Sequence, residues 1–374
     1  MKIAVITNSR IPSLTANSIQ AMKVCQALAD LGHDIRIFAP RETEPASREE
    51  LAAHYGLRIV PDLKWFPSIR RFKRFDFIFH TQYAAETFGA DLIYTWLPQS
   101  AVLALWRRYS TVLEMHADVS GLMGAWWLRR FCKTRGCKLM TVTTGALRKA
   151  LERSAGFGFE DDAVLVAPNG VELERYAVLP EAIDARQLIG LNEGTTVGFT
   201  GHIYPGRGAE LLFDLARQMP DVNFLWVGGT PELVSYWREK LEAVGAKNVT
   251  MTGFVKHERI PLYQAAADVL LMPYSRSIEA SSGQDIAEVI NPMKMFEYMA
   301  SGRAIVTADL PVIREVLNEK NAVFCEPGDI GKWKAGIEDL LADESRRVAL
   351  GRQARQDVES YTWLARVEKI MSGF

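Results

Sequence analysis

Short apolar segments alternate with helix-like segments from the first residues onward, and this alternation constrains the fold more than any other feature. Residues 2–7 are predicted to form a strand, residues 17–31 a helix, and residues 33–39 a second strand. Asn17 resembles a helix cap, with Gln20 three residues later as its capping-box partner. Strand, helix and strand in close succession form a βαβ unit, which implies a parallel sheet.

Two series of such strands follow one another along the chain. The first continues with predicted strands at 91–95, 111–115, 138–143 and 163–167. A polar, proline-containing stretch near 180–193 separates it from a second series at 195–200, 223–227, 248–252, 268–272 and 304–307. Two consecutive series predict an α/β fold of two Rossmann-like, doubly wound domains that face a central cleft, where ligands bind at the C-terminal ends of the strands.

Length and composition agree with a two-domain cytoplasmic protein. The 374 residues suffice for about two domains. The 44 lysines and arginines nearly balance 45 aspartates and glutamates, which argues against a nucleic-acid partner. Four scattered cysteines predict reduced thiols rather than a disulfide framework or a zinc site. No segment reaches the roughly 18 apolar residues of a membrane span, and a strand stands where a signal peptide would begin.

A predicted helix in the last third of the chain combines an anion-binding start with charged side chains. Asn291 is a good N-cap, and Pro292 suits the first position of a helix that Gly302 ends. Free N–H groups at such a start favour an anion, and Lys294 and Glu297 share the face beside it. A cation for phosphates and a carboxylate for ribose hydroxyls suit a sugar nucleotide. The alternative is a core helix with a solvated Lys–Glu pair.

The glycines disfavour two common classes of nucleotide-binding protein. The dinucleotide motif Gly-x-Gly-x-x-Gly is absent after the first strand, which argues against a dehydrogenase. The turn at 201–208 lacks the Lys-Ser/Thr pair of a P-loop, which argues against a P-loop nucleotidase. This turn still joins a strand to a helix and carries Arg207 at the helix start, so it predicts a phosphate site with a fork-shaped cation.

Five segments in this order resemble the GT-B-fold glycosyltransferases of family 4. They are residues 31–35, 166–172, 201–208, 251–255 and 291–300. The resemblance implies a retaining hexosyltransferase of the EC 2.4 class, which moves a hexose from a UDP-, GDP- or ADP-sugar to a hydroxyl acceptor without a metal cofactor. It also implies a role in the synthesis of polysaccharide, glycolipid or another glycoconjugate, with a glycan or a lipid-linked acceptor as partner.

The resemblance also assigns roles to residues. Arg207 and Lys294 would bind the diphosphate, Glu297 the ribose hydroxyls, and the backbone of 253–255 the nucleobase. The implied donor-binding residues are Asn169, Gly201, Arg207, Gly253, Phe254, Val255, Asn291, Lys294 and Glu297. His116 would lie near the transferred sugar and, with Asn17, on the acceptor side; the implied catalytic residues are His116, Arg207 and Lys294. His116 at a strand end could instead be a core histidine with satisfied hydrogen bonds.

The chain departs from the family pattern at three places. Val289 stands where the family has the first glutamate of a pair, and Glu288 is one residue out of register. His202 replaces an arginine of the glycine turn, and residues 15–17 replace a Gly-Gly pair in the first loop. These departures affect recognition of the donor sugar and the approach of the backbone to the donor.

The resemblance implies a division of labour between the domains. Residues 1–178 would form the acceptor-binding domain and residues 190–358 the nucleotide-sugar domain. The last helix, within 360–374, would cross back to the first domain, so that two chain crossings form the hinge.

Two basic and aromatic runs, 65–75 and 126–130, lie in the first half of the chain. One interpretation is that these runs contact a lipid-linked acceptor or an anionic bilayer, which would place the protein at the inner face of the membrane. The other is that they form helices whose arginines snorkel over a core. Two other functions stay open on the sequence alone. One is an NDP-sugar 2-epimerase of the same fold, and the other is a catalytically silent sugar-nucleotide-binding protein.

Overall fold

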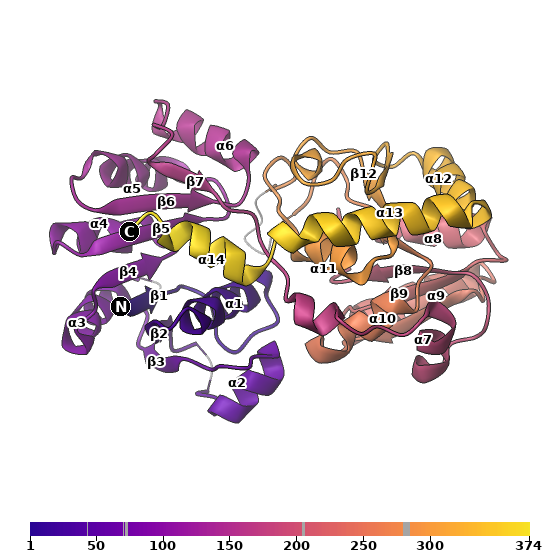
Figure 1. The fold of residues 1–374 in the computed structure, drawn as a ribbon, viewed down its shortest axis with the longest axis horizontal. Coiled ribbons are helices and arrows are strands. Elements are labelled where there is room, and N and C mark those ends of the chain that lie inside the picture. The colour runs from indigo at the N-terminus through magenta and orange to yellow at the C-terminus, as the bar shows by residue number, and fades with distance from the viewer. Residues whose placement is uncertain (43, 70, 72–73, 204–205, 280–284) are drawn as a thin grey trace. The chain divides into compact units, whose positions relative to one another are not determined.

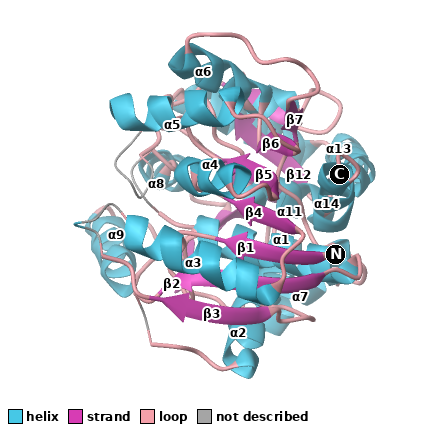
Figure 2. Ribbon diagram, turned by 90° about the vertical axis from the view of Figure 1, so that its left-hand side faces the viewer, coloured by secondary structure: helices cyan, strands magenta, loops and turns pink. Residues whose placement is uncertain are grey.

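The computed structural model describes residues 1–374 except 43, 70, 72–73, 204–205 and 280–284, and it contains two compact units. The first unit is Met1–Asn169 with Trp363–Phe374, and the second is Gly170–Thr362. Each holds one parallel sheet between helices (Figures 1 and 2). The predicted fold of two doubly wound α/β domains is confirmed.

The first unit has a sheet of seven strands in the order β3-β2-β1-β4-β5-β6-β7. Its strands are β1 (Lys2–Ile6), β2 (Asp34–Pro40), β3 (Asp62–Phe66), β4 (Leu92–Thr95), β5 (Ser110–Met115), β6 (Lys138–Val142) and β7 (Val164–Val166). Its helices are α1 (Ala16–Asp30), α2 (Arg48–Tyr55), α3 (Phe75–Phe88), α4 (Pro98–Trp106), α5 (Gly121–Lys133), α6 (Gly145–Ala155) and α14 (Trp363–Met371).

The second unit has a sheet of six strands in the order β10-β9-β8-β11-β12-β13. Its strands are β8 (Thr196–Thr200), β9 (Asn223–Val227), β10 (Val249–Gly253), β11 (Val269–Met272), β12 (Ala304–Ala308) and β13 (Val323–Cys325). Its α-helices are α7 (Ala182–Ile189), α8 (Ala209–Gln218), α9 (Pro231–Ala243), α10 (Ile260–Ala265), α11 (Met293–Ser301), α12 (Ile330–Ala342) and α13 (Glu344–Asp357).

In both sheets the first strand lies inside the sheet, and the order in which the chain adds strands reverses once. In the first unit the chain runs outward from β1 to β3 and returns to β4, beside β1; in the second it runs from β8 to β10 and returns to β11. The central strands are covered on both faces, so they consist of continuous apolar runs such as Val269–Met272. In such folds, ligands bind where the strand order reverses, at the C-terminal strand ends.

The structure corrects two details of the predicted elements. Thr15 is the N-cap of α1 and makes no side-chain cap bond, so the capping box of Asn17 and Gln20 is wrong. Gln20 is buried instead, because its amide binds Glu114. Pro292, not Asn291, is the N-cap of α11, so the helix starts one residue later than predicted.

Two strands at sheet edges were not predicted. The strand β3 contains Asp62 and Lys64, whose charges mask its apolar pattern. It includes Trp65 and Phe66 from one of the basic and aromatic runs. Trp65 donates a hydrogen bond to the Ile11 carbonyl group at 3.0 Å, so this half of the run packs into the fold. Residues 70 and 72–73 of the same run lie outside the described residues. The strand β13 is only three residues long.

The chain passes between the units at Asn169–Gly170 and at Thr362–Trp363. Residues 170–178, which we expected in the first domain, belong to the second unit because the short helix Leu173–Tyr176 packs on α11. Helix α14 packs on α1 in the first unit, as Figure 1 shows. Within the described ranges, no helix has the length and apolar character needed to span a bilayer.

Candidate active site

A glycine turn follows β8 in the second unit and admits a lysine side chain. The Gly201 N–H group donates to the Val227 carbonyl group at 2.8 Å, and Gly201 has a φ of 132°. A Cβ atom at this position would lie 2.6 Å from the Lys294 Nζ atom. The backbone conformation therefore favours glycine here, and a larger residue would displace the Lys294 ammonium group.

Lys294 lies in the first turn of α11 with its ammonium group pointing inward. The residue is half-buried as a whole, but its Nζ atom is inaccessible and has no hydrogen-bond partner among the described residues. The Nζ atom lies 3.9 Å from the centroid of the Phe199 ring. Burial, and next the charge of Arg207, hold the pKa of Lys294 well below its ordinary value, and Glu297 offsets only part of this effect.

Arg207 adds a second positive charge to the same place. Burial raises the pKa of Tyr274 to about 12, while the neighbouring Arg207 charge opposes this shift. Two cations therefore meet in a partly desolvated site, where Glu297 is the one carboxylate that acts on Lys294 among the described residues. Buried charges need opposite charge or hydrogen bonds, so this site favours an anionic ligand.

Glu297 lies one turn after Lys294 on α11 and is oriented by two side chains. Its Oε2 atom lies 3.5 Å from the Gln264 Nε2 atom, and its Oε1 atom lies 4.0 Å from the His257 Nε2 atom. The His257 Nδ1 atom in turn lies 2.9 Å from Arg175 Nη1. The Glu297 side chain is 18% exposed, so it can still accept hydrogen bonds from a ligand.

The predicted nucleobase segment lies at the C-terminal end of β10. Gly253 has a φ of 67°, and its carbonyl group accepts a hydrogen bond from the Gly228 N–H group at 2.9 Å. Gly228 follows β9, so the ends of two neighbouring strands meet here. Phe254 is exposed and Val255 is half-buried. Asn291 is half-buried just before α11.

A buried valine occupies the position where the family has the first glutamate of its pair. Val289 is buried, and its N–H group donates to the Ile286 carbonyl group at 3.0 Å. Glu288, which is one residue out of register with the family pair, is exposed beside it.

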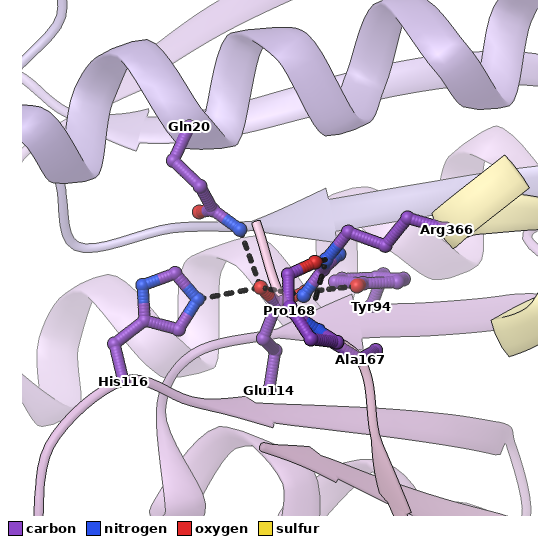
Figure 3. Close-up of polar contacts among 7 residues, drawn as sticks. All are labelled: Gln20, Tyr94, Glu114, His116, Ala167, Pro168 and Arg366. Atoms are coloured by element: carbon purple, nitrogen blue, oxygen red, sulfur yellow. Dashed lines mark hydrogen bonds and ion pairs between the residues drawn. The ribbon is translucent and has the colours of Figure 1, made fainter. Parts of the chain in front are cut away.

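The first unit contains a buried polar network around Glu114, a residue of β5 (Figure 3). Arg366 of α14 donates from Nη2 to Oε1 at 2.7 Å and from Nη1 to Oε2 at 3.3 Å. The His116 Nε2 atom lies 2.5 Å from Oε1. Gln20 donates to Oε1 and Tyr94 to Oε2. The network thus joins α1, α14 and the ends of two central strands.

The groups around Glu114 favour its ionised carboxylate. Its burial alone would raise the pKa, but the Arg366 charge, His116 and the hydrogen bond from Tyr94 together hold it below its usual range. Arg366 also donates from Nε to the carbonyl groups of Ala167, at 3.2 Å, and Pro168, at 3.0 Å. This ion pair satisfies the requirement that a buried charge be paired and fully hydrogen-bonded.

The predicted site residues fall into two groups, one in each unit. In the second unit, Gly201 contacts Lys294, and charge couples Lys294 to Arg207 and Glu297. In the first unit, His116 joins the Glu114 network, and Asn17 is exposed on α1, the helix that also carries Gln20. Asn169 is buried at the end of the first unit's main segment.

Glu114, Arg366 and the partners of His257 belong to no recognisable sequence motif, so they were not predicted. One signal was available: Glu114 is the single charge in the apolar strand Ser110–Met115, and a charge in such a strand needs a buried partner. Arg366 interrupts the apolar stripe of α14 in the same way. Among the described residues, no cluster of three or more His, Cys, Asp or Glu side chains could hold a metal ion.

Two family models match the chain, one in each half. The model described as "Glycosyltransferase Family 4" matches residues 18–175, and the one described as "Glycosyl transferases group 1" matches residues 194–343. The chain belongs to glycosyltransferase family 4. It is a glycosyltransferase of the EC 2.4 class with the GT-B fold, as the resemblance implied.

Curated relatives and solved structures agree with this family. The glycosyltransferase is 25% identical over 359 residues to the GDP-mannose-dependent alpha-(1-6)-phosphatidylinositol monomannoside mannosyltransferase of Mycolicibacterium smegmatis, with 91% of each chain covered. It is 30% identical over 172 residues to the putative teichuronic acid biosynthesis glycosyltransferase TuaH of Bacillus subtilis, of which it spans 40%. Anabaena Alr3699/HepE, solved in complex with UDP, shares the fold with a TM-score of 0.77 at 17% identity, over 100% of this chain and 99% of that one.

Proposed function

We propose that this glycosyltransferase uses a UDP-, GDP- or ADP-hexose as donor. It transfers the hexose to a hydroxyl group of a glycan or lipid-linked acceptor, with retention of anomeric configuration and without a metal ion. The second unit binds the nucleotide and the first unit binds the acceptor.

The observation that carries this proposal is the unpaired ammonium group of Lys294. It is inaccessible, has no hydrogen-bond partner among the described residues, and lies near the positive charge of Arg207. A diphosphate would supply the missing negative charge and hydrogen-bond acceptors. Glu297, at the next turn of α11, would accept hydrogen bonds from ribose hydroxyls. The backbone of 253–255 would contact the nucleobase, and Gly201, Asn169 and Asn291 would complete the donor site.

Transfer breaks the bond between the anomeric carbon and the diphosphate oxygen and forms a bond to the acceptor oxygen. Negative charge collects on the leaving phosphate, where Arg207 and Lys294 would stabilise it; such stabilisation is usually the largest catalytic contribution. The leaving phosphate would accept the acceptor's proton. His116 would contact a hydroxyl group of the transferred sugar.

The relatives and structural neighbours support the donor and acceptor classes. The Mycolicibacterium relative is GDP-mannose-dependent and acts on a phosphatidylinositol mannoside, and the Anabaena neighbour was solved with UDP and with UDP-glucose. A relative from Acholeplasma laidlawii is a processive diacylglycerol alpha-glucosyltransferase.

A binding panel tests the donor site. UDP, GDP and ADP, each with its hexose derivatives, would be screened by thermal shift and titration calorimetry against the wild type and Lys294→Gln. We expect one nucleotide series to bind, and Lys294→Gln to weaken that binding. Lys332→Gln is the matched control, because Lys332 lies on α12 with a side chain that is 64% exposed. Equal affinity of Lys294→Gln and wild type would contradict the diphosphate site.

The same protein separates transfer from the alternative functions. Incubation with the donor that binds, with and without a glycolipid acceptor, should release nucleoside diphosphate and leave the donor sugar unisomerised. An isomerised sugar would support a 2-epimerase, and binding without any release would support a catalytically silent protein.

We further propose that helix α5 contacts an anionic membrane surface. Leu122 is 91% exposed and Met123 and Trp126 are about half exposed, so the start of α5 presents apolar side chains to solvent. Arg130 lies over the exposed Trp106 ring, at 5.4 Å from its centroid. Apolar side chains beside basic ones are typical of surfaces that bind anionic lipids.

Vesicle sedimentation tests this surface. The protein should pellet with vesicles of phosphatidylcholine and phosphatidylglycerol, and less with phosphatidylcholine alone. The double variant Leu122→Ser, Trp126→Ser should remain in solution, whereas Tyr236→Ser, an exposed aromatic residue on α9, should behave like the wild type. Equal sedimentation of both variants would contradict contact through α5.

A further inference from the structure

We propose that Glu114 and Arg366 are positioning residues for His116: they fix its imidazole so that Nε2 carries the hydrogen and Nδ1 is left as an acceptor for a sugar hydroxyl. This inference rests on the proposed function for the identity of the ligand. It concerns only residues of the first unit.

Glu114 acts only as a hydrogen-bond acceptor in this network. Gln20, Arg366 and Tyr94 all donate to its two oxygen atoms, and no acceptor faces it in the network. An ionised carboxylate has no hydrogen to give. The ring atom 2.5 Å from Oε1, His116 Nε2, therefore carries the hydrogen of this bond.

His116 is the most accessible side chain of the network. Glu114, Gln20, Tyr94 and Arg366 are all buried, whereas the His116 side chain is 20% exposed. His116 is thus the member through which the network reaches solvent. Figure 3 shows its second ring nitrogen turned away from Glu114, and this Nδ1 atom has no hydrogen-bond partner among the described residues.

Arg366 keeps Glu114 as a hydrogen-bond acceptor. Burial by itself raises the pKa of Glu114, and the Arg366 charge is the largest effect that opposes it. Without Arg366, a protonated Glu114 could donate to His116 Nε2, and the hydrogen of the neutral ring would then move to Nδ1. The arginine on the last helix therefore decides which ring atom the site presents. A hydroxyl of the sugar would donate to that atom.

Nitrogen NMR of the full-length protein tests the tautomer without any ligand. With 15N-labelled histidine, on the alkaline side of the imidazole titration, the signals absent from His116→Gln identify His116 among the six histidines. We expect protonated Nε2 and unprotonated Nδ1. A hydrogen on Nδ1 would overturn the inference, and this outcome does not depend on whether the donor binds.

A double-mutant cycle tests the positioning role. The pair variant Glu114→Gln, Arg366→Met removes both buried charges together, so that neither remains alone. We expect it to lower kcat for release of nucleoside diphosphate from the donor by roughly tenfold to a hundredfold, without changing the affinity for the free nucleoside diphosphate. In a His116→Ala background, the same pair variant should have less than about a twofold effect.

Asp30→Asn, Arg58→Met is the matched control, because these residues form an exposed ion pair at 2.9 Å in the same unit. An equal loss of kcat in both backgrounds, or no loss in either, would overturn the inference. Failure of the wild type to bind any nucleoside diphosphate would instead contradict the proposed function, and the NMR measurement would still decide the tautomer.

Discussion

Gly201 and Lys294 are so close that a Cβ atom at residue 201 would lie 2.6 Å from the lysine Nζ atom. This contact adds to the hydrogen bond that the Thr200 N–H group, at the end of β8, donates to the Tyr298 hydroxyl group of α11 at 2.7 Å. The ammonium group occupies the space that any other residue at position 201 would fill. The position of the Lys294 ammonium group thus depends on the absence of a Cβ atom at residue 201.

Gly201→Ala should weaken binding of UDP or GDP by roughly tenfold or more, because it displaces Lys294. It should also lower the free energy of unfolding by about 1–3 kcal/mol, because residue 201 has a positive φ. Calorimetry and thermal unfolding measure the two effects. Gly245→Ala is the control: Gly245 also has a positive φ, of 71°, but no atom of the described residues lies within 4 Å of an added Cβ atom. Equal affinities of the two variants would show that the contact with Lys294 does not matter for binding.

Binding of a nucleoside diphosphate should take up protons through Lys294. Burial and Arg207 lower the pKa of this lysine, and a bound diphosphate would raise it again. The complex therefore holds more protons than the free protein, so affinity should fall as pH rises through the lowered pKa, below the ordinary value of 10.5. Calorimetry in buffers of different ionisation enthalpy, at about pH 8.5, measures the uptake. Lys294→Met should abolish it; uptake that persists in this variant would assign the proton elsewhere.

Glu297→Gln should weaken the intact sugar nucleotide and the free nucleoside diphosphate alike, because ribose is common to both. Loss of a charge-assisted hydrogen bond corresponds to about 1.5–3 kcal/mol. Titration of both ligands measures this loss, with Glu338→Gln, an exposed glutamate of α12, as the control. If Glu297→Gln weakened only the sugar nucleotide, Glu297 would contact the sugar rather than the ribose.

Acid should destabilise the protein through Glu114. Arg366 and the hydrogen bonds lower the folded-state pKa of this carboxylate, so its stabilising contribution is complete above the unfolded-state value near 4.5 and declines as pH falls toward the lower folded-state value. Denaturant unfolding between about pH 3 and pH 7 should show this decline.

Arg366→Met should cost about 3–5 kcal/mol at neutral pH because it leaves a buried charge alone. The pair variant Glu114→Gln, Arg366→Met should show a flatter acid limb than the wild type; an unchanged slope would contradict the assignment.

Deletion of Trp363–Phe374 should abolish transfer. It removes Arg366 and uncovers the surface of α1, whereas Tyr361 stays in place, where its ring packs 5.3 Å from that of Phe296 on α11. Dye binding should report the exposed apolar surface, and titration should show that nucleotide binding by the second unit largely survives. Removal of Gly373 and Phe374 alone is the control. Transfer at the full rate by the larger deletion would show that α14 is dispensable.

The sequence was sufficient for the central strands and for the end of α11, because these depend on local pattern. Val269–Met272 is a continuous apolar run, and Gly302 ends α11 with a φ of 67°. The N-cap of α11 was not predictable in this way, since Asn291 satisfies the local rule but the structure uses Pro292. The edge strand β3 was missed because Asp62 and Lys64 face solvent and break the apolar pattern.

The donor-side residues could be selected from motifs because each lies at a strand end or a helix start. The Glu114 network could not be selected in this way. Its members come from β4, β5, α1 and α14, and the two charged partners are 252 residues apart in the sequence. A lone charge in an apolar strand indicates that a partner exists, but only the packing of α14 on α1 identifies which residue it is.

The division of the chain has a consequence for synthesis on the ribosome. The first unit is discontinuous in sequence, because Trp363–Phe374 belongs to it and follows the whole of Gly170–Thr362. Glu114 is synthesised before Gly170–Thr362, and its partner Arg366 is synthesised after that segment. Pairing of Arg366 with Glu114 therefore joins two parts of the first unit that the whole second unit separates in the sequence.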